Sequence, residues 1–146
     1  MSNLSKTSIL ACFLILLVSS SCKKYEDGPW FSIYSKMERA TGNWRFSLVM
    51  DGGTDKTEEH AQQMVNMSRN GYLQWVQGYS GSVWNTYGPE GRWEFIDDKN
   101  QIRMHFDRGV ATEFTLIWDI TRLAYGDLRL RRFEGERKIE WHLWKY

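Results

Sequence analysis

Residues 113–121 read EFTLIWDIT, and this stretch decides the fold class. Every second residue in it is apolar, and the positions between are mostly polar or charged. The apolar set is Phe114, Leu116, Trp118 and Ile120. Because successive side chains of a strand point to opposite faces, a period of two predicts a β-strand with one buried and one solvated face.

The same period recurs along the chain from Gly42 onward, interrupted by turn sequences. Asn70-Gly71 is the strongest turn signal, because both residue types adopt the positive φ angles that a two-residue hairpin needs. Residues 80–89, which contain Gly, Ser and Asn, are predicted to form a loop. The eight predicted strands are residues 42–50, 62–68, 72–79, 92–96, 102–106, 113–121, 128–131 and 139–143. In the first strand the residues predicted to share one face are Trp44, Phe46, Leu48 and Met50.

The short connections predict antiparallel neighbours in chain order, since parallel pairing needs a crossover of a dozen or more residues. An open sheet of eight strands would leave two unpaired edges that invite aggregation, and closure removes both. The sequence therefore predicts an all-β fold, an eight-stranded antiparallel up-and-down barrel. A β-sandwich is the structural alternative. A membrane-spanning barrel is disfavoured by the charged polar faces and by the shortness of several strands.

The N-terminus has the order of features found in a secretion signal. A basic residue, Lys6, precedes the apolar run 9–18, which small serines separate from Cys22. About ten apolar residues are too few to span a bilayer as a helix, which takes roughly twenty. The arrangement resembles a bacterial lipoprotein signal, in which the cysteine becomes the first mature residue and carries acyl chains. An ordinary cleaved signal and an uncleaved anchor are the alternatives.

The chain is thus predicted to comprise a signal peptide at 1–21, a lipidated tether at 22–41 and a barrel domain at 42–146. In the tether, Ser35 and Glu38 stand at the spacing of a capping box. Cys12 falls in the leader, so the mature domain has no disulfide and depends on its core. The 19 Lys and Arg residues nearly balance the 18 Asp and Glu residues, which excludes the basic footprint of a nucleic-acid binder.

In several short segments the chain resembles the lipocalin-like lipoproteins of Bacteroidetes-type bacteria. The segments that carry the resemblance are Cys22-Lys23-Lys24-Tyr25, Gly28-Pro29, Ser35-Lys36-x-Glu38-Arg39, Gly42-Asn43-Trp44, Gly91-Arg92-Trp93-Glu94-Phe95, Asp97-Asp98-Lys99-Asn100, Leu128-Arg129-Leu130 and the last aromatic strand. The resemblance implies a single lipocalin-like barrel at a membrane surface. It also implies that Trp44 packs at the closed end of the barrel, with Arg132 or Arg137 as its cationic partner.

An excess of aromatic residues, 15% of the chain with eight tryptophans, is the one feature that points to binding. Rings at a barrel mouth suit stacking on a small, partly apolar ligand. The predicted ligand contacts are Trp75, Trp84, Tyr87 and Trp118. The alternative is a non-enzymatic interaction module of an envelope or cell-surface assembly, in which Trp75 is core and Trp84 covers the barrel end. The packing of the barrel interior distinguishes ligand binding from the interaction module. No pocket remains if the lumen is filled by the side chains expected to point inward: Phe46, Phe95, Phe106, Phe114 and Trp118.

Catalytic motifs are weak, and we expect neither an enzyme nor a metal or other cofactor. His60, His105 and His142 are not at the spacing of paired metal ligands. The acidic pairs Glu58-Glu59 and Asp97-Asp98 are adjacent, so on a strand their side chains would point to opposite faces. The expected partners are the membrane, through acyl chains on Cys22, and a small ligand or an envelope protein. The expected location is the cell envelope, most naturally the outer membrane. The sequence does not decide between the periplasmic face and the surface face of that membrane.

Overall fold

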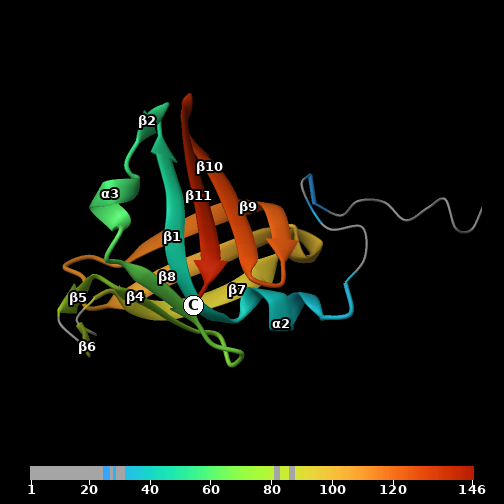
Figure 1. Ribbon diagram of the computed structural model, residues 1–146, viewed down its shortest axis with the longest axis horizontal. Helices are drawn as coiled ribbons and strands as arrows, with labels where there is room; N and C mark the ends of the chain where they lie inside the picture. Colours follow the sequence, from blue (N-terminus) through green and yellow to red (C-terminus); the bar gives the residue numbers. More distant parts are fainter. Residues whose placement is uncertain (1–24, 27, 29–31, 81–82, 86–87) are drawn as a thin grey trace, which may run out of the picture.

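Antiparallel pairing links each strand of the main sheet to its neighbours in a ring (Figure 1). The computed structural model describes residues 25, 26, 28, 32–80, 83–85 and 88–146. The strands of the main sheet are β1 (Gly42–Asp51), β2 (Thr54–Asp55), β3 (Met64–Met67), β4 (Tyr72–Val76), β7 (Glu90–Ile96), β8 (Gln101–Arg108), β9 (Phe114–Ala124), β10 (Asp127–Glu134) and β11 (Arg137–Lys145). Within these residues the helical elements are α2 (Lys36–Ala40), α3 (Thr57–His60) and the 3₁₀ turn η1 (Asp97–Lys99).

Strand β1 closes the barrel because it pairs on both of its edges. Trp44 lies opposite Val65 of β3 on one side and opposite Lys145 of β11 on the other. Eight strands (β1, β3, β4 and β7 to β11) therefore form a closed antiparallel barrel, and β2 only pairs with the last residues of β1. The predicted up-and-down barrel is confirmed, and the sandwich alternative is excluded.

The predicted alternation fails halfway along β1. A β-bulge shifts the pairing with β11 between Phe46 and Leu48. The extra residue reverses which side chains face inward. Trp44 and Phe46 are buried as predicted, but beyond the bulge it is Val49 that is buried, while Leu48 and Met50 are only half-buried.

Four short elements were not predicted. The segment predicted as a loop at 80–89 overlaps a small two-stranded sheet, β5 (Gly78–Ser80) with β6 (Val83–Asn85). Strand β2 and helix α3 occupy the connection from β1 to β3, where the sequence shows no clear period. These elements have two to four residues each, which is too short for a periodic pattern to reveal them.

The two ends of the barrel differ, and we call them the closed end and the open end. Helix α2 packs near β9 at the closed end, where the connections 68–71, 97–100 and 125–126 also lie. Helix α3 and the β5–β6 hairpin lie at the open end, on the left of Figure 1. The predicted capping box starts α2: Ser35 Oγ accepts from Glu38 N, and Glu38 Oε2 accepts from Ser35 N. No helix among the described residues is long and apolar enough to cross a membrane.

Trp44 sits at the closed end as the family resemblance implied, but its cationic partner is different. Its indole Nε1 donates to Ala40 O at 2.8 Å, which ties β1 to α2. The cation over its ring is Lys145, with Nζ 5.2 Å from the centroid. Arg132 instead lies over Trp118, and Arg137 forms an ion pair with Asp51 near the open end. The two arginines could not reach Trp44 because both lie far along β10 and β11 from the closed end.

Candidate ligand-binding groove

The lumen of the barrel is filled by aromatic side chains from several strands. Trp141 is at the centre of this cluster: its ring centroid lies 4.2 Å from that of Trp118, 5.1 Å from Phe46 and 5.2 Å from Trp75. Phe106 continues the cluster at 6.1 Å from Trp75. Such edge and tilted contacts are typical of a packed core rather than of an empty ligand cavity.

Two of the predicted ligand contacts belong to this packing. Trp118 is 0% exposed, and Trp75 is half-buried with its Nε1 donating to Gln63 Oε1 at 2.9 Å. The side chain of Trp84 and the whole of Tyr87 lie outside the described residues. Of the phenylalanines expected to fill the lumen, Phe46 and Phe106 are buried and Phe95 packs against the core. Phe114 is at the open end, partly exposed and stacked on Phe106 at 4.9 Å.

A concave surface lies on the opposite side of the wall, over the outer face of β4, β7 and β8. Strand register places Tyr72, Arg92, His105 and Thr115 in one row across four strands. In β4, β7 and β8 the neighbours of these residues, such as Leu73, Trp93 and Met104, are buried, so the row faces outward there. The groove around this row has a volume of about 680 Å³. Its lining residues are Asn70, Gly71, Tyr72, Gly91, Arg92, Trp93, Glu94, Arg103, His105 and Arg108.

Two glycines fix the backbone of this groove. A Cβ on Gly91 would lie 1.8 Å from the carbonyl oxygen of His105, so β7 and β8 can approach here only without a side chain. The approach coincides with a shift in their pairing between Glu90 and Gly91. Gly71 has a φ of 86°, as the turn between β3 and β4 requires, and its Cβ position lies 3.3 Å from Trp93 O.

Arg92 is the central charge of the groove. Both acids that flank it on β7 are engaged elsewhere: Glu94 accepts from Arg103 at 2.7 Å, and Glu90 lies 3.6 Å from Arg108. The Arg92 side chain has no ion pair or hydrogen bond with any residue that the structure describes, and it is exposed. An exposed guanidinium offers five donors in a planar fork that fits carboxylates and phosphates. The groove can therefore accept an oxyanion at Arg92.

The residues beside Arg92 add further polar groups. Burial, and then the nearby Glu90 carboxylate, raises the pKa of Tyr72, so its phenol remains protonated and able to donate. The Arg108 guanidinium lies 6.0 Å from the Tyr72 ring centroid. His105 Nδ1 is 2.9 Å from Thr115 Oγ1, which holds the imidazole in the row. A surface of this polarity suits a ligand rich in oxygen atoms better than an apolar one.

Sequence reasoning did not find this site. Tyr72, Arg92 and His105 are scattered over more than thirty positions, and only the registers of β4, β7 and β8 bring them together. The available signal was the Gly91-Arg92 pair at the start of a strand, where a glycine marks a close backbone approach. Among the described residues, no cluster of three His, Cys, Asp or Glu side chains is placed to hold a metal ion.

Comparisons with known proteins give no match, either to protein-family models or to curated proteins. The resemblance to lipocalin-like lipoproteins therefore stays a prediction from short motifs. Cys22, the predicted lipid attachment site, lies outside the described residues.

Proposed function

We propose that the protein is a lipid-anchored, non-enzymatic recognition module of the cell envelope that binds a polar anionic ligand in the groove around Arg92. The anchor is acylated Cys22, most naturally in the outer membrane. The single observation that carries the binding role is an exposed arginine whose neighbouring carboxylates are already paired. Such a cation can accept an anionic partner without first breaking an internal ion pair.

The earlier expectation of a small, partly apolar ligand in the lumen has less support. Trp118 and Trp141 occupy the space that such a ligand would need, and both are buried. A ligand could enter the lumen only by displacing a ring of this cluster, and its own contacts would have to replace the packing energy that is lost. Recognition on the outer wall leaves the core intact, and it agrees with the alternative expectation of an interaction module.

The test is a titration of the full-length protein in detergent micelles. The probe is trigalacturonate, which carries carboxylates and hydroxyl groups, and the matched neutral probe is its methyl ester. We expect trigalacturonate to bind and the Arg92→Gln variant to bind it about tenfold more weakly, because a charge-assisted hydrogen bond is lost. Calorimetry gives both dissociation constants.

The control variant is Lys138→Gln, which removes an exposed cation of β11 outside the groove. It should bind trigalacturonate as the wild type does. Equal binding of the acid and its ester, unchanged binding by Arg92→Gln, or no binding of trigalacturonate would each contradict the proposed ligand class.

A further inference from the structure

The start of the described chain is docked on the barrel only a few residues after the predicted lipid site. Tyr25 is 5% exposed and belongs to the core cluster, and its hydroxyl donates to Lys99 O at 2.7 Å. The next residue, Glu26, forms an ion pair with Arg131 at 3.1 Å. Although they fall in the predicted tether, these residues are therefore held against the closed end.

The length of chain between Cys22 and Tyr25 limits how far the lipid can be from the barrel. Only Lys23 and Lys24 separate the two residues. A chain spans at most about 3.6 Å per residue, so an acylated Cys22 would have its Cα no more than about 11 Å from that of Tyr25. With Tyr25 docked, the closed end must then lie next to the bilayer surface.

The closed end also carries exposed aromatic side chains, which we call the aromatic rim: Tyr34, Tyr125, Trp144 and Tyr146. Tyr34 and Tyr125 stack with their centroids 4.4 Å apart. The Arg45 guanidinium lies 4.0 Å from the Tyr146 ring centroid, and Lys145 Nζ lies 4.7 Å from that of Tyr125. Tyr and Trp prefer the interface between lipid and water, where an apolar ring and a polar tip are both solvated.

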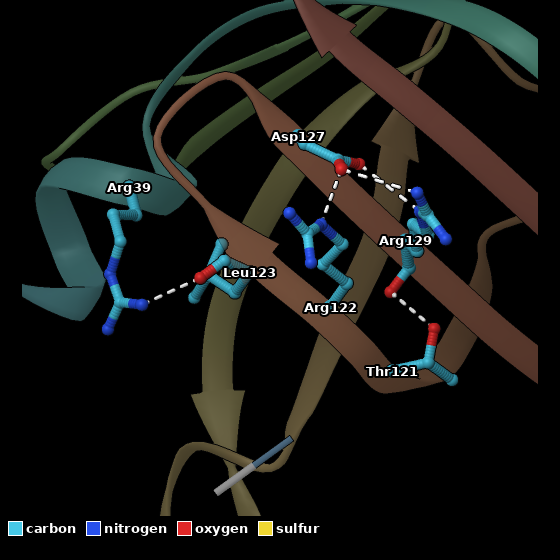
Figure 2. A network of polar contacts seen from close by, with 6 residues as sticks. All are labelled: Arg39, Thr121, Arg122, Leu123, Asp127 and Arg129. Atoms are coloured by element: carbon cyan, nitrogen blue, oxygen red, sulfur yellow. Dashed lines mark hydrogen bonds and ion pairs between the residues drawn. The ribbon is translucent and has the colours of Figure 1, made fainter. Parts of the chain in front are cut away.

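Additional cations lie on the wall beside the rim, and Figure 2 shows how they are held. Arg122 and Arg129 both reach the carboxylate of Asp127, so two positive charges share one negative charge. Asp127 lies directly opposite Trp144 in the register of β10 and β11. In the same view Arg39 Nη1 donates to Leu123 O at 2.6 Å, which fastens α2 to the end of β9. Arginines next to interfacial aromatic rings can pair with lipid phosphates.

We propose that the barrel sits with its closed end on the bilayer, oriented by docked Tyr25 and by insertion of the aromatic rim among the lipid headgroups. This orientation rests on the proposed anchor at Cys22. It directs the open end away from the membrane and leaves the groove on the side wall.

The experiment compares two exposed positions at opposite ends of the barrel. Tyr125 and Phe133 are 60% and 58% exposed, and they lie on the β9–β10 turn and near the β10–β11 turn. Tyr125→Cys and Phe133→Cys are each labelled with bimane in the full-length acylated protein. The labelled proteins are then incorporated into vesicles of phosphatidylethanolamine and phosphatidylglycerol that contain lipids spin-labelled near the headgroup.

We expect the label at position 125 to be quenched about threefold more strongly than the label at 133, since only the closed end contacts lipid. Equal quenching, or stronger quenching at 133, in protein that floats with the vesicles would overturn the orientation while leaving the anchor intact. Failure to float would instead contradict the anchor, and the orientation with it. Labelling of protein with no introduced cysteine reports whether the Cys22 thiol is blocked.

A second variant tests whether the docking of Tyr25 orients the barrel, or whether the short link to Cys22 is enough. Tyr25→Ala removes the hydrogen bond to Lys99 and the buried ring but retains Cys22. It should still float with the vesicles and should lose most of the quenching difference between 125 and 133. An unchanged difference would mean that Tyr25 does not orient the barrel.

Discussion

Individual tryptophans of this barrel differ in whether the indole N–H has a hydrogen-bond acceptor. Trp44 and Trp118 are both 0% exposed, and each has a cation about 5 Å from its ring. The Nε1 of Trp44 donates to Ala40 O at 2.8 Å, whereas the Nε1 of Trp118 is buried with no hydrogen-bond partner among the described residues. A buried donor without a partner is costly, so the two residues should respond differently to loss of the N–H.

We expect Trp44→Phe to destabilise the protein by about 1–2 kcal/mol more than Trp118→Phe. Both changes remove the same volume, but only the first leaves the Ala40 carbonyl without its donor. The free energies of unfolding from urea denaturation of the two variants give the comparison directly. The matched burial of the two rings is the internal control, and equal destabilisation or the reverse order would contradict the assignment.

Among the elements, the extensions of β1, β10 and β11 toward the open end stand out, because they project beyond the other strands in Figure 1. The Asp51–Arg137 pair links the end of β1 to the start of β11, with Arg137 Nη2 2.6 Å from Asp51 Oδ2. Gly52 N also donates to Lys138 O at 2.9 Å. Hydrogen bonding by Arg137, and then its charge, lowers the pKa of Asp51 below its ordinary value of 3.8.

A lowered carboxyl pKa means that the stabilising contribution of Asp51 is complete above pH 3.8 and is lost as the pH falls through the lower, folded-state value. We therefore expect Asp51→Asn to lower the melting temperature at neutral pH and to match the wild type once the pH is well below 3.8. Thermal melts across this range measure the difference. Glu136→Gln, at an exposed turn position that has no ion pair among the described residues, should show no such pH dependence.

Most strands could be predicted from the sequence, because each core-facing stretch repeats every two residues over a length that reveals the period. The Asn70-Gly71 turn likewise set the β3–β4 hairpin. The residues assigned to the wrong face lie beside irregularities in strand pairing, which do not change the hydrophobic pattern of the sequence. The bulge at residue 47 reversed Leu48 and Val49, and the shift beside Gly91 altered the pairing of β7 with β8. The groove depends on those registers, so its row of polar residues could not be read from the chain alone.

For the whole molecule, the proposed attachment to the membrane depends on one side chain. Cys22→Ser should move the protein from the membrane fraction to the soluble fraction of its host, because acyl chains supply the binding energy that stable anchoring needs. Incorporation of radiolabelled palmitate should disappear in the same variant. Cys12→Ser, in the predicted leader, is the matched control and should remain in the membrane fraction. Continued sedimentation of Cys22→Ser with membranes would contradict the anchor.

The pairing of β1 with β11 also governs how the molecule can be made. A polypeptide is synthesised from its amino end, so β1 is available long before its partner β11. Until the final residues arrive, both margins of the growing sheet are unprotected, and the slowest contacts to form join the most distant parts of the sequence. Loss of residues 144–146 would remove the pairing of Trp44 and Arg45 with β11 and would so weaken the closure of the ring.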